Sequence, residues 1–210
     1  VTQTYGDMGA ALRPYKRTPV PALPFFDEGV WWAQDAGAAQ AAQLLKSLPK
    51  GSKVLDMCSA PGGKALQLSS FGFDVVAVEK SAKRAARLRQ NLERCKCHVD
   101  VRVQDATLVD DMFDGVLVDA PCSATGTARR RPDILRKELD LEALATTQAA
   151  LLDAAWRCLK PGGLLVFSSC SALTADAEAS FAAFLQRTAA AEVVPVAAAE
   201  LGFVDHAGVV

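Results

Sequence analysis

The sequence predicts an α/β fold of the Rossmann-like type, a mostly parallel sheet with helices on both faces. Short, almost wholly apolar segments alternate five times with longer segments whose apolar residues recur at helical spacing. Runs of this kind are typical of parallel strands, which are joined by right-handed helical crossovers and are therefore buried on both sides. The chain has 210 residues and is 50% hydrophobic, so it can bury the core that such a sheet requires.

We expect one folded domain over residues 31–210, preceded by an extended arm over residues 1–30. The arm is predicted because proline and glycine are frequent there, as in RPYKRTPVPALPFFDEG. Within the domain, Ser81 is a capping residue at one helix start, and the run Pro161-Gly162-Gly163 breaks a long helix. The predicted strands are residues 53–58, 74–79, 98–105, 113–120 and 164–171. The predicted helices are residues 34–48, 62–72, 81–95, 139–159 and 175–187.

Polar and nucleophilic groups stand at the carboxyl ends of all five predicted strands. These groups are Asp56 to Cys58, Glu79, Asp105, Asp119 to Cys122, and Cys170. In parallel sheets, ligands bind beyond the carboxyl ends of the strands, where these ends meet at one edge. The sequence therefore predicts one site at this edge. The alternative for the acids is that they only cap the helices that follow them.

The segment DMCSAPGGK, residues 56–64, is predicted to bring a ligand close to the backbone at a helix start. It matches neither the GxGxxG dinucleotide fingerprint nor the GxxxxGK[ST] phosphate-binding loop. Gly62 and Gly63 nevertheless allow close approach to a helix amino terminus. Glu79 stands where an acid can bind a ribose, and Asp105 stands where it can contact a base. The pattern indicates an adenosine ligand without a long phosphate tail.

Cys122 and Cys170 are the candidates for covalent chemistry. A thiolate is a strong nucleophile, and a strand end near helix amino termini and cations lowers thiol pKa values. A lone cysteine at a strand end is more often a packing residue, but two of them beside Asp119 and Lys64 favour an active site. Cys158, by contrast, is expected to be buried as a small apolar residue.

The composition limits the partners of the protein. The net charge is −1, which argues against a module dedicated to nucleic acid but allows a local basic patch at Arg129, Arg130 and Arg131. The alternative for these arginines is a solvated basic loop. The six cysteines are irregularly spaced, which indicates a reducing compartment, and CKCH at 95–98 lacks the second ligand pair of a zinc site, so we expect no metal. No signal peptide and no membrane-spanning run is expected.

Several of these segments together resemble the catalytic domain of the Nop/Sun family of RNA cytosine-5 methyltransferases. The resemblance is closest to its bacterial Sun members, which methylate small-subunit ribosomal RNA. The matching segments lie within residues 28–187 and are QDAGAAQ, VLDMCSAPGGK, VVAVEKS, FDGVLVDAPCSATGTARRRPDI, LKPGG and SSCS. The resemblance implies the Rossmann-like fold of S-adenosylmethionine-dependent methyltransferases. It also implies S-adenosyl-L-methionine as cofactor and carbon 5 of an RNA cytosine as target.

The resemblance implies roles for single residues. Cys170 matches the family's nucleophile, and Cys122 matches the second cysteine, which is implicated in product release. Asp119 matches the acid beside cofactor and base, and Lys64 is expected to orient either Asp119 or the base. Carbon 5 of cytosine becomes nucleophilic once a thiolate adds at carbon 6, and an acid near nitrogen 3 stabilises the charge that forms. The implied cofactor-binding residues are Cys58, Ser59, Ala60, Pro61, Gly62, Gly63, Lys64, Glu79, Asp105 and Asp119, and the implied RNA-binding residues are Arg129, Arg130 and Arg131.

The sequence departs from the family pattern in several places. After Cys170 the family usually has a proline, two acids and an asparagine, whereas this chain has Thr174-Ala175-Asp176-Ala177. Glu79 replaces the usual aspartate. The ending LGFVDHAGVV has no clear match to the family's final strand pair, so the alternative that the catalytic domain is incomplete at its carboxyl end is kept. A second hypothesis therefore stands, a non-catalytic methyltransferase-like RNA-binding factor in ribosome assembly. A methyltransferase acting on protein or small molecules is less favoured, because its reaction needs no pair of cysteines.

The expected partner is ribosomal RNA, with transfer RNA as the alternative and ribosomal or assembly-factor proteins as further partners. No membrane partner is expected. The expected location is a bacterial cytoplasm, and a mitochondrion or nucleolus is the alternative for a eukaryotic source.

Overall fold

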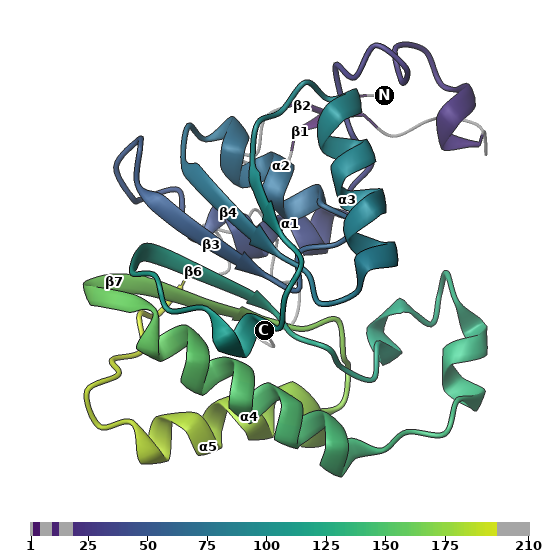
Figure 1. The fold of residues 1–210 in the computed structure, drawn as a ribbon. Helices are drawn as coiled ribbons and strands as arrows, with labels where there is room; N and C mark the ends of the chain where they lie inside the picture. Colours follow the sequence, from purple (N-terminus) through teal and green to yellow (C-terminus); the bar gives the residue numbers. More distant parts are fainter. Residues whose placement is uncertain (1, 5–9, 13–18, 197–210) are drawn as a thin grey trace.

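The computed structural model describes residues 2–4, 10–12 and 19–196 and has a five-stranded parallel sheet at its centre (Figure 1). The strand order is β5-β4-β3-β6-β7. The chain therefore runs from the middle of the sheet to one edge and then, from β6 on, to the other. The strands are β3 (Lys53–Met57), β4 (Asp74–Val78), β5 (Asp100–Arg102), β6 (Phe113–Asp119) and β7 (Leu159–Ser168). This confirms the predicted α/β class and the parallel sheet.

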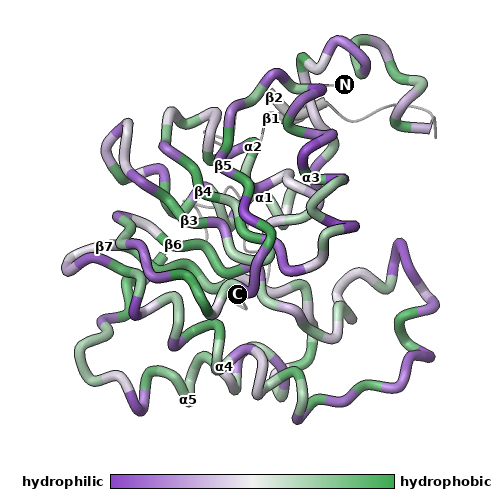
Figure 2. The backbone as a smooth tube through the Cα atoms, viewed as in Figure 1, coloured by the Kyte–Doolittle hydropathy of each residue, from purple (hydrophilic) through white to green (hydrophobic). Residues whose placement is uncertain are grey.

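Helices cover both faces of the sheet. In Figure 1, α4 and α5 lie below the sheet, and α1, α2 and α3 lie above it. Alternate residues of β3 enter two separate cores: Val54 packs with the helices above, while Leu55 and Met57 pack with α4. Figure 2 shows the same division, with hydrophobic strands inside and a largely hydrophilic α3 at the surface. The helices are α1 (Ala36–Gln43), α2 (Gly63–Ser70), α3 (Ala82–Arg94), α4 (Leu141–Arg157) and α5 (Ala179–Arg187).

The helix starts follow local capping chemistry. The Ser81 hydroxyl accepts a hydrogen bond from the amide of Arg84, so the predicted cap of α3 is confirmed. Asp140 caps α4 in the same way through the amide of Ala143, which places the start of this helix two residues after the predicted one. Most predicted elements are correct within a few residues at their ends, as is usual where helices fray and strands leave the ladder.

Two boundaries differ from the prediction for identifiable reasons. The run Pro161-Gly162-Gly163 does not separate α4 from a later strand but lies inside β7. Phe113 pairs with Leu159 and Gly115 with Leu164, so the ladder holds on both sides and the proline-glycine run forms an irregularity between them. The last predicted helix, 175–187, begins only at Ala179, because a wide turn, Thr174–Glu178, precedes it.

The predicted arm is held at the carboxyl end of α3. Arg94 of α3 donates to the carbonyl oxygens of Phe26, at 2.6 Å, and Trp31, at 3.1 Å. Its guanidinium also lies 4.0 Å from the centre of the Phe26 ring, a cation–π contact. Within residues 1–30, β1 (Thr2–Thr4) and β2 (Ala10–Leu12) pair antiparallel, and Val20–Ala22 forms a short 3₁₀ turn. Among the described residues, no helix is long and apolar enough to cross a bilayer.

Candidate active site

The loop between β3 and α2 is shaped for close approach to its backbone. Two of its residues have left-handed backbone angles, Cys58 with φ 60° and Gly62 with φ 105°. A Cβ atom at Gly62 would lie 2.5 Å from a methyl group of Leu88, so a glycine is needed there for two independent reasons. The amide of Ser59 donates to the carbonyl of Val78, which ties the loop to the end of β4. No side chain caps the start of α2, so no side chain accepts a hydrogen bond from the first amides of this helix.

Asp56, at the end of β3, and Cys58, in the loop, are both groups whose neutral form is favoured by burial. Asp56 is fully buried, and its Oδ2 accepts a hydrogen bond of 2.6 Å from the Ser59 hydroxyl. Burial raises the pKa of Asp56 to about 7, against the hydrogen bond from Ser59. Burial, with the charge of Glu79 next in importance, raises the pKa of Cys58 to about 12. Cys58 is therefore a thiol at neutral pH, which fits a place in a binding loop better than a nucleophile.

Glu79 lies at the end of β4 and is almost fully buried. Its Oε1 accepts from the amide of Ser81 at 2.9 Å. Its Oε2 lies 3.4 Å from Nη2 of Arg84, and that nitrogen also donates to the carbonyl of Ala60 at 2.8 Å. Arg84 thus joins the tip of β4 to the β3–α2 loop. Within the described residues, Oε2 is a buried oxygen that accepts no hydrogen bond and has only the ion pair with Arg84.

Asp105 lies past the end of β5 and is fully engaged in local contacts. Its Oδ1 accepts from the amide and hydroxyl of Thr107, and its Oδ2 pairs with Lys80 Nζ at 2.7 Å. The hydrogen bond from Lys80, followed by those from Thr107, lowers the pKa of Asp105 to about 2. The capping alternative therefore describes part of what Asp105 does. A contact of this carboxylate with a base stays a prediction.

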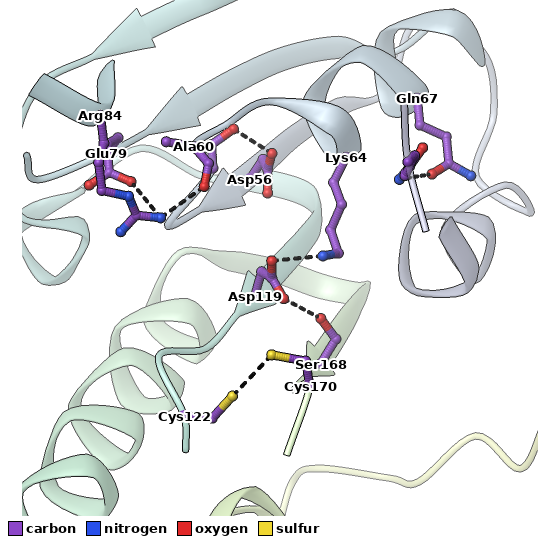
Figure 3. A network of polar contacts seen from close by, with 12 residues as sticks. Asp56, Ala60, Lys64, Gln67, Glu79, Arg84, Asp119, Cys122, Ser168 and Cys170 are labelled. Carbon is purple, nitrogen blue, oxygen red and sulfur yellow. Dashed lines mark hydrogen bonds and ion pairs between the residues drawn. The ribbon is translucent and has the colours of Figure 1, made fainter. Parts of the chain in front are cut away.

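Lys64 and Asp119 connect the β3–α2 loop with the carboxyl ends of β6 and β7 (Figure 3). Lys64, in the first turn of α2, places Nζ 2.7 Å from Oδ2 of Asp119, at the end of β6. The other carboxylate oxygen of Asp119 accepts from the hydroxyl of Ser168, at 3.1 Å, and the two residues are direct neighbours in the sheet. Asp119 is therefore fixed from both sides while its side chain remains 38% exposed to solvent.

Cys122 and Cys170 face each other with their sulfur atoms 3.5 Å apart. They lie on the two loops that follow β6 and β7, so the predicted convergence of the strand ends holds for both cysteines. The hydrogen bond from Cys170 lowers the pKa of Cys122 to about 6, and the same contact raises the pKa of Cys170. Two thiols that share one proton lose the first proton easily and the second with difficulty. The pair therefore carries one thiolate near neutral pH.

The three predicted RNA-binding arginines lie on an exposed segment that projects beyond the carboxyl edge of the sheet in Figure 1. Arg130 pairs with Asp35 at 2.5 Å, and Arg131 pairs with Asp133 at 3.1 Å. Arg129 makes no polar contact within the described part of the chain. Arg129 is thus available to a ligand within the described residues, whereas Arg130 and Arg131 are in surface ion pairs, which are weak.

Several residues at the edge escaped the sequence prediction. Arg84 and Ser168 hold predicted residues in place, and Asp176 and Gln148 form a buried contact described below. Serine and glutamine carry little signal in a single sequence. Asp176 did carry one, since it stands in the segment where the chain departs from the family pattern.

The remaining cysteines have structural roles. Cys158 is buried between α4 and the sheet, as predicted, and its thiol lies 3.1 Å from the carbonyl of Val109. Cys95 and Cys97 pack against the core above the sheet. Both lie away from the strand ends that carry Cys122 and Cys170.

Comparison with known proteins assigns the chain to a family. A family model described as 16S rRNA methyltransferase RsmB/F matches residues 42–207. "Ribosomal RNA small subunit methyltransferase B" of Xanthomonas campestris pv. campestris is 41% identical over 209 residues, which cover 94% of this chain and 47% of the relative. The protein of the same name from Shewanella oneidensis is 44% identical over 183 residues, which cover 83% of this chain and 42% of the relative. The chain spans about half the length of the curated relatives it matches.

Solved structures agree with this assignment. The structure described as NSun6 from Pyrococcus horikoshii with SFG matches with a TM-score of 0.73 and 27% identity, over 81% of this chain and 46% of that one. The structure described as PH0851 matches with a TM-score of 0.72 and 27% identity, over 83% of this chain and 41% of that one. With the matching family model and the identity to curated relatives, the chain belongs to the RsmB/F family of 16S rRNA methyltransferases.

Proposed function

We propose that this chain carries the catalytic site of an S-adenosylmethionine-dependent methyltransferase that modifies carbon 5 of a cytosine in small-subunit ribosomal RNA. The observation that carries the proposal is the pair of sulfur atoms, 3.5 Å apart, at the ends of neighbouring strands. Methylation at an electron-poor ring carbon needs a nucleophile that adds and later leaves. The names of the curated relatives support ribosomal RNA as the substrate.

The β3–α2 loop and the first strand ends fit the cofactor. The start of α2 after Gly62 has no side-chain cap, and Glu79 keeps one buried oxygen without a hydrogen bond within the described residues. We assign the loop Cys58 to Lys64 to the methionine part, Glu79 to the ribose hydroxyls and Asp105 to the adenine. When bound, the cofactor supplies an electrophilic methyl group on a sulfonium. The matched NSun6 structure lends further support, because it is described as containing SFG and has the same fold as this chain.

The thiol pair and Asp119 carry the covalent steps. Cys170, which is exposed, loses its proton to solvent, and its sulfur forms a bond to carbon 6 of the cytosine. Asp119, oriented by Lys64 and Ser168, would bring a proton to ring nitrogen 3, which neutralises the charge that the addition places there, and would take the proton back when Cys170 leaves. Carbon 5 then takes the methyl group.

Release of the product needs a base. After methylation, the proton on carbon 5 must leave, and the electron pair of that bond expels Cys170. Cys122 is the candidate base, because its sulfur lies 3.5 Å from that of Cys170, which is bonded to the neighbouring ring carbon. Arg129, Arg130 and Arg131 would hold RNA phosphates beside this pair. The bacterial sources of the relatives favour the cytoplasm as the compartment.

Labelled cofactor and purified 16S ribosomal RNA test the proposal. Wild-type chain should transfer label to the RNA, Cys170→Ala should reduce transfer by at least about a thousandfold, and Cys122→Ala should trap a covalent protein–RNA adduct. Cys97→Ala, which removes a cysteine packed against the core, is the control and should leave transfer unchanged. Binding of both ligands without any transfer by the wild-type chain would overturn the enzyme and favour the alternative, a non-catalytic factor in ribosome assembly.

A further inference from the structure

The positions of the two sulfur atoms depend on how two loops are tied together. Cys122 and Cys170 both lie outside the regular strands, so no sheet ladder fixes them. The amide of Gly126 donates to the carbonyl of Cys170 at 3.0 Å, and a Cβ atom at Gly126 would lie 2.8 Å from that oxygen. The hydroxyls of Ser123 and Ser171 lie 2.8 Å apart. These contacts join the two loops directly. The position of the Cys122 loop also depends on its contacts with the rest of the protein.

A buried carboxylate holds that loop. Asp176 is 3% exposed, and its Oδ2 accepts a hydrogen bond of 2.8 Å from the amide of Ser123, the residue after Cys122. Asp176 reaches this position because the backbone of the Thr174–Glu178 turn leaves helical geometry at this residue, with φ −96° and ψ −112°. Burial acts to raise the pKa of Asp176, but its hydrogen bonds outweigh burial and lower it, so the group is a carboxylate at neutral pH.

Gln148 completes a clamp around Cys122. This side chain of α4 is fully buried, and its Nε2 donates to Oδ1 of Asp176 at 2.7 Å and to the carbonyl of Pro121 at 2.9 Å. The residue before Cys122 is therefore held by Gln148, and the residue after it is held by Asp176. A hydrogen bond from the side chain of Ser171, the residue after Cys170, also helps to lower the pKa of Asp176. The hydrogen bonds of Asp176 and Gln148 to the backbone, by contrast, both fall on the Cys122 loop.

We propose that Asp176, supported by Gln148, is a positioning residue that holds Cys122 at the distance from Cys170 needed for release of the methylated product. The inference deepens the proposed methyltransferase function and rests on it. It gives a role to the segment Thr174–Ala177, where the chain departs from the family pattern. Loss of the clamp should impair the step that needs Cys122, while Cys170 can still form its bond to the base.

The test compares Asp176→Asn, which keeps size but removes the charge, with the conservative Asp176→Glu and with Glu178→Ala, an exposed acid two residues away. In single-turnover experiments with labelled cofactor and 16S ribosomal RNA, Asp176→Asn should transfer its first methyl group within about twofold of wild type. Steady-state turnover should fall by at least about tenfold, a loss typical of small displacements of a reacting group. The covalent adduct should accumulate on denaturing gels, as for Cys122→Ala. Asp176→Glu should restore part of the turnover, and Glu178→Ala should behave as wild type.

A second measurement needs no RNA. The pH midpoint for alkylation of Cys122 by iodoacetamide, read at each cysteine by mass spectrometry, should be higher in Asp176→Asn than in wild type, because the loosened sulfur contact lowers the pKa of Cys122 less. Unchanged turnover together with an unchanged alkylation midpoint would overturn the inference. Equal loss of first and later turnovers, without adduct, would also overturn it and indicate a structural role. If wild type itself transfers no methyl group, the proposed function fails, and the alkylation midpoint alone then decides whether Asp176 positions Cys122.

Discussion

The carboxyl edge of the sheet has two halves that are built differently. At the ends of β4 and β5, Glu79 and Asp105 are tied to cations and to nearby backbone amides. At the ends of β6 and β7, Cys122 and Cys170 share a proton across a contact between two loops. In the first half, called the binding half below, the carboxylates are already paired without a ligand, as a binding site requires. The second half, called the thiol half below, holds a proton that can move between two sulfur atoms, as a site for covalent chemistry requires.

The difference follows from what supports each half. The binding half is mounted on strand ends and helix caps, where backbone hydrogen bonds set positions. The thiol half is mounted on loops that are joined by side chains such as Ser123 and Ser171 and held from below by Asp176. Lys64 and Asp119 connect the two halves through one ion pair. A change away from this ion pair should therefore leave the other half largely intact.

The largest effect that we expect concerns Asp56, under the binding half. Its pKa is about 7 in the folded protein against an ordinary value of 3.8, so the folded state keeps a proton that the unfolded state releases. The stabilisation is complete below pH 3.8 and is lost as the pH rises towards 7. Between about pH 4.5 and about pH 8, wild type should lose about 3 kcal/mol of unfolding free energy relative to Asp56→Asn.

Urea unfolding of both proteins, followed by tryptophan fluorescence at the two pH values, measures this difference. The comparison cancels the contribution of other groups, Asp105 included, whose own loss of stabilisation lies at much lower pH. If the unfolding free energies of wild type and Asp56→Asn changed in parallel with pH, Asp56 would be charged in the folded protein over this range. The contrast drawn here between the two halves would then be wrong.

A smaller effect is expected in the thiol half. The pKa of Cys122, about 6, depends first on the hydrogen bond from Cys170. Cys170→Ala removes that donor, so the alkylation midpoint of Cys122 should rise from about 6 towards the ordinary thiol value of 9.0. Solvent access to this half reduces the shift, so we expect a rise of about one to two pH units. Site-resolved alkylation with iodoacetamide across pH 5 to 10 measures it.

The control for this prediction is Cys97→Ala, which should leave the Cys122 midpoint in place. A midpoint near 9 already in wild type would mean that the two sulfurs do not share a proton. The thiol half would then be no more poised for proton movement than the binding half.

Much of this edge could be predicted from the sequence, and the missing parts share a physical cause. The convergence of Lys64, Asp119, Cys122 and Cys170 was predictable, because strand alternation in a parallel sheet brings carboxyl ends to one edge. The contact between Gln148 and Asp176 was not, because it joins α4 to a turn and depends on how that helix packs. Long-range side-chain contacts of this kind leave no periodic pattern in a single sequence.

The strand boundaries teach the same lesson. The Pro161-Gly162-Gly163 run has the local signal of a break, yet β7 continues through it because β6 offers pairing partners on both sides. Tertiary pairing overrode a local signal there. The start of α4 was predicted two residues early because the capping Asp140 could be recognised only with its hydrogen bond in view.

The smallest effect that we expect separates the RNA contact of the thiol half from its chemistry. Arg129 has no polar partner within the described residues, whereas Arg130 and Arg131 must first leave Asp35 and Asp133. Each phosphate contact to a single strand contributes about 0.7 to the salt dependence of affinity, so Arg129→Ala should lower the slope by about 0.7 and the triple alanine variant by at most about 2. Filter binding of 16S ribosomal RNA from low to high salt measures these slopes.

Lys50→Ala is the matched control for the arginine variants, because Lys50 is an exposed cation just before β3, at the opposite edge of the sheet from the cysteines. Its slope should equal that of wild type, and the alkylation midpoint of Cys122 should be unchanged in all arginine variants. An unchanged affinity and slope in the triple variant would remove RNA binding from this segment. The thiol half would then rely on other surfaces to bring the base to Cys170, and its proton-sharing pair would remain intact.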